Sequence, residues 1–224
     1  MLHPDDFFDL SHCPFADIFD GVEYVWEVLP RISIYIKTHL KPGIEGNVSP
    51  FAQIAEEVYI GPGTVVEPGV MIKGPAIIGA NCQIRQGAYL RGDVLVANGA
   101  VIGHTTEVKN SLLFDKAEVP HFAYVGDSVL GWKTHLGAGV KVSNFKVNRT
   151  NVVVHINDQK YETGLRKFGA ILGDEVEIGC NSVLNPGTLV GKRTLGYANL
   201  SMSGYYPPDS IVKLRQSQEI VKRE

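Results

Sequence analysis

The sequence predicts an all-β stack of short strands joined by tight corners, with a helical segment before it. Three observations lead to this fold class: large apolar side chains recur at every sixth position, a compact side chain follows each of them by four residues, and glycines and prolines cluster between the units. A unit with one large and one compact inward residue suits a short strand followed by a corner. A repeat with a fixed period indicates a solenoid.

The first element is expected over residues 1–45, where apolar residues recur at steps of three and four. This spacing predicts one or two amphipathic helices, with Pro30 interrupting the run and Pro42 and Gly43 ending it. We expect the apolar side to pack on the first coils of the stack or on a neighbouring subunit. The pattern consists of Ile18, Val22, Val25, Trp26, Leu29, Ile32, Ile36 and Leu40.

The second element is the repeat, expected over residues 46–205. A set of hairpins with accidental spacing is the alternative, but hairpin strands vary in length and lose such a register. The large column is Val48, Ile54, Ile60, Val66, Ile72, Ile78, Ile84, Leu90, Val96, Ile102, Val108 and Phe114. The compact column is Ala52, Val58, Thr64, Val70, Ala76, Cys82, Ala88, Val94, Ala100 and Thr106.

The register changes twice further along the chain. After Phe114 it breaks and returns shifted, which we interpret as a local insertion. Residues 145–168 lack the pattern, and it then resumes in phase, so this segment is an excursion from the stack, with Asn157 and Asp158 suited to turn a hairpin. Residues 206–224 are expected to be a tail. The later columns contain Tyr124, Leu130, Leu136 and Val142, then Leu172, Ile178, Leu184 and Val190.

Composition narrows the class of protein. The chain has 224 residues, a net charge of −3 and no basic stripe, which disfavours nucleic-acid binding. It has no apolar run of eighteen residues and no signal-peptide pattern, so we expect a cytoplasmic protein that does not enter a membrane. Its three cysteines, Cys13, Cys82 and Cys180, are odd in number and scattered, which argues against disulfides and against a metal knuckle.

Four stretches between residues 82 and 145 carry a narrower resemblance. They are Cys82–Leu90, Ile102–His104 with Glu107–Lys109, Pro120–Asp127, and Leu136–Gly139 with Asn144. Among hexapeptide-repeat acyltransferases they resemble the acetyltransferase half of the bifunctional N-acetylglucosamine-1-phosphate uridylyltransferase/glucosamine-1-phosphate acetyltransferases, over about residues 50–215. The resemblance implies a left-handed parallel β-helix of about seven coils and a homotrimer. Residues 1–45 lack the glycine-rich nucleotide loop that would begin the uridylyltransferase half.

The resemblance also implies a catalytic residue. Transfer of an acetyl group from a thioester to a sugar amine needs a base for the proton of the attacking nitrogen, and an imidazole suits neutral pH. Among the seven histidines the resemblance selects His121. This residue lies where the register breaks, so its ring need not occupy a core position.

The binding residues are implied by the resemblance as well. Arg85 and Lys109 match positions that grip the sugar phosphate, and the Ala138 N–H would stabilise an oxyanion. The sequence departs from the family at His135, Phe145 and Cys180, and the excursion is expected to overhang the acceptor pocket. The identity of the acceptor sugar therefore stays open. The substrate residues are Arg85, Lys109, Tyr124, His135, Asn144 and Lys167. The acetyl-CoA residues are Ala138, Asn144, Phe145, Cys180, Ala198 and Arg215.

The expected activity is therefore acetyl-CoA-dependent N-acetylation of glucosamine 1-phosphate or a related phosphorylated or nucleotide-linked amino sugar, with no metal required, as in UDP-N-acetylglucosamine biosynthesis. One alternative is a non-catalytic β-helix whose helices recruit a separate nucleotidyltransferase. Another is a γ-carbonic-anhydrase-like metalloenzyme using His104, His121 and His135. That family places two of its ligands five residues apart, whereas these three are seventeen and fourteen apart.

Overall fold

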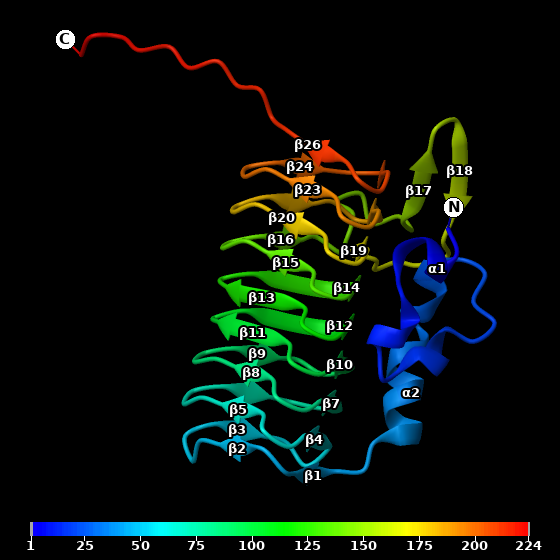
Figure 1. Cartoon of the computed structure of the whole chain (residues 1–224). Helices are drawn as coiled ribbons and strands as arrows, with labels where there is room; N and C mark the ends of the chain where they lie inside the picture. Colours follow the sequence, from blue (N-terminus) through cyan, green and yellow to red (C-terminus); the bar gives the residue numbers. More distant parts are fainter. Residues whose placement is uncertain (1, 224) are drawn as a thin grey trace.

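Residues 2–223 of the computed structural model are described here, and they form a left-handed parallel β-helix flanked by helices and a hairpin (Figure 1). One face of the coil is a nine-stranded sheet with one strand from each coil, so the helix has nine coils. The sequence indicated about seven. The count was low because the first coil begins at Gly43, before the apolar column, and the last coil uses strands that follow Val190.

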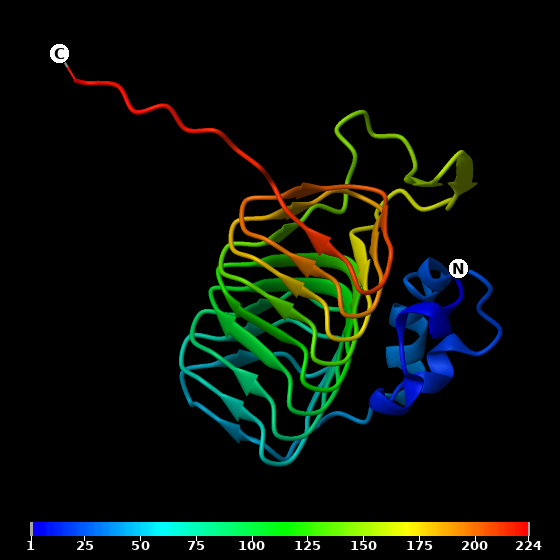
Figure 2. The same ribbon diagram turned by 45° about the horizontal axis from the view of Figure 1, so that its top comes forward.

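Each coil has three faces, which we call A, B and C, and Figure 2 shows them from nearer the end of the stack. Face A consists of β1 (Gly43–Ile44), β4 (Val58–Ile60), β7 (Ala76–Ile78), β10 (Val94–Val96), β19 (Ala170–Leu172), β22 (Thr188–Val190) and β25 (Tyr205–Tyr206). Face B consists of β2 (Asn47–Val48), β5 (Val65–Val66), β8 (Gln83–Ile84), β11 (Val101–His104), β13 (Glu118–His121), β15 (His135–Leu136), β20 (Glu177–Ile178), β23 (Leu195–Gly196) and β26 (Ile211–Val212). Face C consists of β3 (Gln53–Ile54), β6 (Met71–Ile72), β9 (Tyr89–Leu90), β16 (Lys141–Val142), β21 (Val183–Leu184) and β24 (Ser201–Met202).

Two longer strands, β12 (Glu107–Leu113) and β14 (Tyr124–Leu130), run from face C across the corner into face A. Asn110 and Asp127 lie at that corner with φ of 40° and 50°. Paired residues in successive strands are 17 positions apart in these two coils, whereas they are 18 apart between β4, β7 and β10. The break in the repeat is therefore a shortening of two coils and not the local insertion inferred from the sequence.

The shortening changes which side chains point inward. The apolar column from Ile60 to Val108 fills the interior, as predicted. Beyond it, Leu113 and Val125 occupy the interior, whereas Phe114 lies outside in a second core and Tyr124 lies outside the interior core on face C. The assignments of Phe114 and Tyr124 to the inward column are wrong because each was counted with a constant step of six.

The N-terminal segment covers face A. It contains α1 (Pro4–Phe7), three 3₁₀ turns (Leu10–His12, Ala16–Phe19 and Val25–Val28) and α2 (Arg31–His39), which begins directly after Pro30. None of these helices within residues 2–223 is long and apolar enough to cross a membrane. Helix α2 makes its main contacts with β10 and β12, in the fourth and fifth coils. Its apolar residues form the second core with outward side chains of face A.

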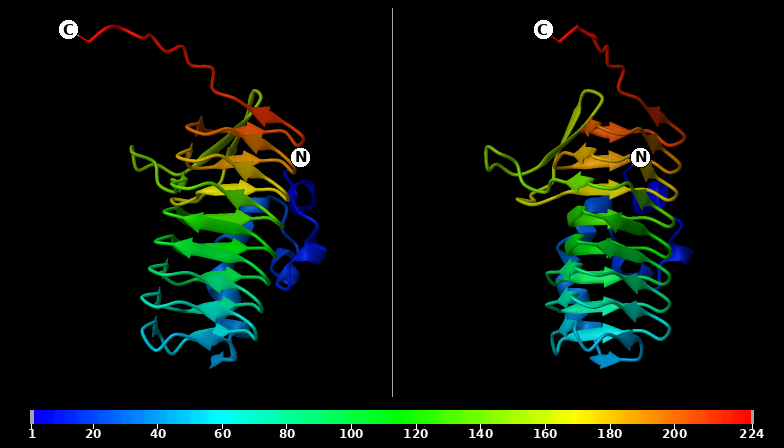
Figure 3. Two further views of the ribbon diagram at one scale, coloured as in Figure 1. Left: turned by 60° about the vertical axis from the view of Figure 1, so that its left-hand side comes forward. Right: turned by 90° about the vertical axis from the view of Figure 1, so that its left-hand side faces the viewer.

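The excursion contains the predicted hairpin, β17 (Val153–Ile156) paired antiparallel with β18 (Gln159–Glu162). Asn157 begins its two-residue turn with a φ of 52°. The hairpin packs on the helical segment, with the Tyr161 ring 5.9 Å from the ring of Tyr24. The loop before the hairpin extends to one side of the stack, and the tip of the hairpin also projects from it (Figure 3). The apolar residues of the excursion, among them Val154, Ile156 and Phe168, belong to the second core.

Candidate active site

Most of the predicted site residues lie along the two edges of face C. The edge shared with face B, which we call the B–C corner, holds Arg85 and His121. The edge shared with face A, which we call the C–A corner, holds Lys109 and Asn144. Tyr124 lies on face C between the two edges, at the start of β14. One chain therefore places the predicted residues along two separate edges rather than in one closed pocket.

The B–C corner aligns four of the predicted residues in one column. Successive coils are joined there by backbone hydrogen bonds, which place His104, His121, Ala138, Cys180 and Ala198 directly above one another. The bonds run from Phe122 N–H to His104 O (2.9 Å), Gly139 N–H to His121 O (3.0 Å), Asn181 N–H to Ala138 O (2.9 Å) and Asn199 N–H to Cys180 O (2.9 Å). Cys180 and Ala198 are exposed and Ala138 is half-buried, so the small side chains above His121 leave the corner open.

His121 is exposed at the end of β13. The next residue, Phe122, has a φ of 51°, which turns the chain sharply at this corner. One coil below, a Cβ on Gly103 would lie 1.6 Å from the carbonyl oxygen of Pro120, so only glycine permits this close stacking. The imidazole is thus held on a sharply turned corner and remains accessible from solvent.

Arg85 lies on the same edge, two coils below His121. Its guanidinium donates through Nε and Nη2 to the amide oxygen of Gln83, at 3.2 and 2.9 Å. Gln83 is neutral, and within residues 2–223 no carboxylate forms a salt bridge with Arg85. Its charge is therefore available to an anion.

Lys109 is placed differently from the expectation. Its ammonium lies 3.1 Å from Oδ2 of Asp127, whose side chain is only 6% exposed. Asn110 also donates to this carboxylate at 2.9 Å, and Asn144 donates a short hydrogen bond to Oδ2. The ammonium of Lys109 is thus already paired inside the C–A corner, which limits its use as a phosphate ligand.

Tyr124 borders the same network. Burial raises the pKa of its hydroxyl, and the negative charge of Asp127 raises it further. The hydroxyl therefore stays protonated at neutral pH and can donate a hydrogen bond. Its position on the outer surface of face C suits contact with a bound molecule rather than packing in the interior.

The excursion returns to the stack beside Asn144. The Phe168 N–H donates to the carbonyl oxygen of Asn144 at 3.0 Å, and the Arg166 guanidinium lies 5.7 Å from the ring centre of Phe145. The exposed Lys167 therefore stands near Asn144 and Phe145.

Two predicted residues lie apart from both edges. His135 is on face B, where its Nδ1 is 3.1 Å from a carboxylate oxygen of Glu118. Arg215 is in an exposed segment after the last strand. Because His135 stands away from His104 and His121, one chain does not form the three-histidine metal site. No group of three or more potential metal ligands is found among residues 2–223.

Asp127 is the residue that reasoning from the sequence missed. It organises Lys109, Asn110 and Asn144, although it was noted only as part of a motif. A signal was present, because Lys109 and Asp127 are 18 residues apart, close to the length of one coil. Neither their register nor the position of Asn144 could be obtained in this way, because both depend on the shortened coils.

Comparison with known proteins identifies a family model and related sequences. The family model of the GMPPB C-terminal domain matches residues 72–199. A bifunctional protein GlmU of Methanococcus vannielii is 30% identical over 198 residues, covering 88% of this chain and 47% of the relative. A bifunctional sugar-1-phosphate nucleotidylyltransferase/acetyltransferase of Sulfurisphaera tokodaii is 33% identical over 144 residues, covering 56% of this chain and 36% of the relative.

A solved structure, AntD, an N-acyltransferase from Bacillus cereus, is 17% identical with a TM-score of 0.30, covering 77% of this chain and 82% of that chain. The chain spans about half the length of the first curated relatives. The resemblance to hexapeptide-repeat acyltransferases is confirmed by the family model and the two sequence relatives. Because the family model covers more than half of its residues, the chain belongs to the family of the GMPPB C-terminal domain.

Proposed function

We propose that the protein is an acetyl-CoA-dependent sugar N-acetyltransferase with His121 as its general base, acting on glucosamine 1-phosphate or a related phosphorylated or nucleotide-linked amino sugar. The observation that carries the proposal is the column of the B–C corner, in which the exposed His121 lies in line with Ala138 and Ala198. The names of the relatives, which include an acetyltransferase, add support.

The proposed reaction uses these groups in a simple order. The sugar nitrogen attacks the thioester carbonyl, and His121 accepts the proton that the nitrogen loses. The N–H of Ala138 stabilises the negative oxygen of the tetrahedral intermediate. Collapse of this intermediate breaks the carbon–sulfur bond and releases coenzyme A, whose sulfur takes up a proton, while the acetyl group remains on nitrogen.

The acceptor phosphate would bind at Arg85. Its guanidinium donates hydrogen bonds to the neutral Gln83, and a planar cation of this kind binds phosphate through two parallel hydrogen bonds. Lys167 supplies a second exposed cation beside Asn144. Tyr124 would contribute a hydrogen bond to the sugar from face C.

We further propose that the active enzyme is a homotrimer in which a neighbouring subunit closes the site. Arg215 lies in an exposed tail, and Cys180 and Ala198 are exposed along the corner, so a second copy is needed to bury a coenzyme there. Light scattering of the purified protein should give a mass about three times 24.5 kDa. A monomer would contradict this arrangement.

The activity itself is tested by release of the coenzyme A thiol. Acetyl-CoA should be consumed with glucosamine 1-phosphate or another member of a panel of amino-sugar phosphates and nucleotide-linked amino sugars, and N-acetylated product should appear by mass spectrometry. Failure of the whole panel, with a folded protein, would reject the proposal.

A non-catalytic assembly protein is the second candidate, and the ion pair of Lys109 with Asp127 favours it because a predicted phosphate ligand is already occupied. Thermal unfolding discriminates the two. An enzyme should be stabilised by acetyl-CoA or coenzyme A through mass action. A scaffold should show no shift in its unfolding temperature with either compound.

A further inference from the structure

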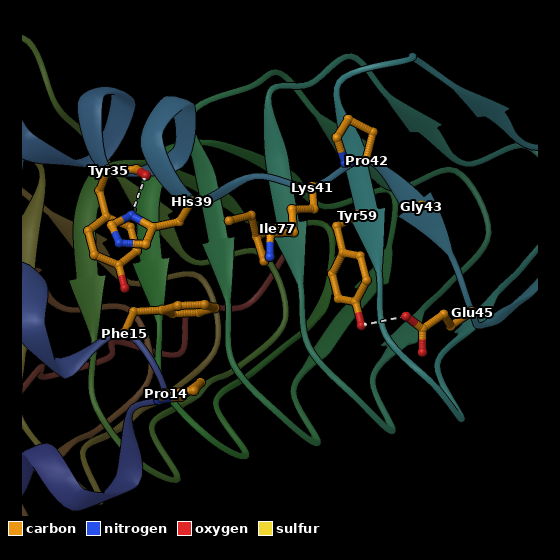
Figure 4. A pocket seen from close by; sticks show the side chains of 10 residues that line it. All are labelled: Pro14, Phe15, Tyr35, His39, Lys41, Pro42, Gly43, Glu45, Tyr59 and Ile77. Atoms are coloured by element: carbon orange, nitrogen blue, oxygen red, sulfur yellow. Dashed lines mark hydrogen bonds between the residues drawn. The ribbon is translucent and has the colours of Figure 1, made fainter.

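A pocket of about 590 Å³ lies between the N-terminal segment and the first three coils, separate from the candidate active site (Figure 4). It exists because the helical segment leaves the lower end of face A uncovered. Outward residues of face A are fully buried from Leu95 to Leu189, whereas Ile77 retains 9% exposure and Tyr59 is half-buried. The pocket has no part in the function proposed above.

Aromatic side chains form two walls of this pocket. On one side the Phe15 and Tyr35 rings meet edge to face, with centroids 6.2 Å apart. The Tyr35 hydroxyl donates to Asp17 at 2.6 Å, and the His39 ring stacks on Tyr35 at 4.1 Å. These contacts fix the rings before any ligand binds. Ile77 forms an apolar floor between this wall and Tyr59 (Figure 4).

The opposite wall is the ring of Tyr59. Its hydroxyl donates to Oε1 of Glu45 at 3.1 Å, which holds the ring in place and orients the carboxylate at the edge of the pocket. A carboxylate in this position accepts hydrogen bonds from N–H or O–H groups of a ligand. The pocket therefore combines flat apolar surfaces with a directed acceptor.

The pocket also contains a cation. Lys41 lines it together with Ile77 (Figure 4). Among residues 2–223, Lys41 forms no salt bridge, although the Glu45 carboxylate lines the same pocket. An ammonium without an ion-pair partner, in a pocket with aromatic walls, favours a ligand that has both a planar ring and an anionic group.

We propose that this pocket binds a nucleotide, with the base against the rings of Tyr59 and Phe15 and the phosphate at Lys41. Aromatic side chains bind bases through their flat faces, and a lysine binds phosphate as a point charge. The volume lies within the usual range for small-molecule sites. A free sugar phosphate fits less well because it lacks a ring that can stack on the aromatic walls.

Calorimetric titration of the full chain with UMP, AMP, GMP and inorganic phosphate tests the proposal. At least one nucleotide should bind, and Tyr59→Ala should weaken it about tenfold or more through loss of stacking. Tyr59→Phe keeps the ring and should retain most of the affinity. Lys41→Gln should weaken binding several-fold, whereas Lys73→Gln is the matched control, since Lys73 is an exposed lysine beside the Tyr89 ring on another part of the stack.

The outcomes separate the alternatives. Binding of phosphate as tightly as of nucleotides would show an anion site only and would overturn the proposal. Nucleotide binding that survives Tyr59→Ala would place the ligand elsewhere and would also overturn it, as would the absence of heat with every nucleotide. Thermal unfolding of each variant establishes that a loss of binding does not reflect loss of the fold. Nucleotide binding and acetyl transfer are measured separately, so either proposal can fail alone.

Discussion

A single buried carboxylate organises the C–A corner. Asp127 is 4% exposed, and its two oxygens accept from Lys109, Asn110 and Asn144. Because a buried carboxylate is stable only when it is paired and hydrogen-bonded, these donors are required by the fold itself. The same contacts hold the Asn144 side chain next to the strand that carries Tyr124. Structural and functional demands therefore meet at one residue.

Substitution of Lys109 distinguishes these two demands. Lys109→Met removes the cation and leaves Asp127 buried without it, so we expect a loss of about 2–4 kcal/mol in the free energy of unfolding. Chemical denaturation measures this loss. Adding Asp127→Asn should restore part of it, because the unpaired charge is then gone. Unchanged stability combined with a raised KM for the acceptor would instead assign Lys109 to substrate binding.

The side chain of His121 has no comparable structural role. It is exposed, so His121→Ala should leave the unfolding temperature unchanged while lowering kcat by about 10²–10⁴-fold through loss of the base. His155→Ala, on the exposed side of the hairpin, is the matched control and should retain full activity. Full activity of His121→Ala in the thiol-release assay would refute the mechanism.

Most inward residues could be predicted from the repeat, and the errors have a physical cause. A fixed period places side chains correctly only while every coil has the same length. At Leu113 and Val125 the strand runs straight through the corner and one residue is lost, so counting by six selected Phe114 and Tyr124 instead. His121 and Ala138, which lie in one column, could both be selected from the sequence motifs that carry the resemblance. The pairing of Lys109 could not be settled from charge alone, because Lys109 suited a phosphate equally well.

At the scale of elements, the N-terminal segment is fastened to the seventh coil by Asp174. Its carboxylate accepts from the Asp9 N–H at 2.6 Å and from the Trp132 N–H at 2.8 Å, and its own N–H donates to the carbonyl oxygen of Phe7 at 3.0 Å. Burial raises the pKa of this carboxyl group even though the two N–H donors lower it. The sequence predicted the helices and the hairpin, but this attachment depends on contacts between residues far apart in the chain.

The stability of this segment should fall at alkaline pH. Burial raises the pKa of the Cys13 thiol from its ordinary value of 9.0 to about 12. Below pH 9 the thiol is protonated in both the folded and the unfolded chain, so it does not make the free energy of unfolding depend on pH. Between these values only the unfolded chain loses the proton, so ionisation favours unfolding by about 2 kcal/mol at pH 10.5.

Denaturation of the wild type and of Cys13→Ala at pH 8 and pH 10.5 measures this contribution. The variant should start from a lower stability because it leaves a cavity, yet lose about 2 kcal/mol less between the two pH values. Parallel pH profiles for the two proteins would show that Cys13 is not buried as described. Tyr35 titrates in both proteins, so its contribution cancels in the difference.

At the scale of the whole molecule, two cores share face A. Its inward residues fill the coil, and its outward residues, among them Leu95, Leu112 and Leu189, are buried beneath the helical segment and the hairpin. A parallel sheet of this kind is apolar on both sides and needs a cover. The helical segment is therefore part of the folding unit rather than an appendage. The sequence positions of the helices could not establish this by themselves.

Removal of that cover is the final prediction. A chain that begins at residue 41 would expose outward apolar side chains, each of which loses about 1.5–3 kcal/mol of burial, so we expect aggregation detected by light scattering. A chain that ends at residue 213 is the control, because residues 214–223 are exposed and lie outside the last strand. This control should keep its unfolding temperature, and it should show a raised KM for acetyl-CoA if Arg215 contacts the coenzyme. A shortened chain from residue 41 that stays monodisperse, with wild-type circular dichroism, would mean that the β-helix is stable without its cover.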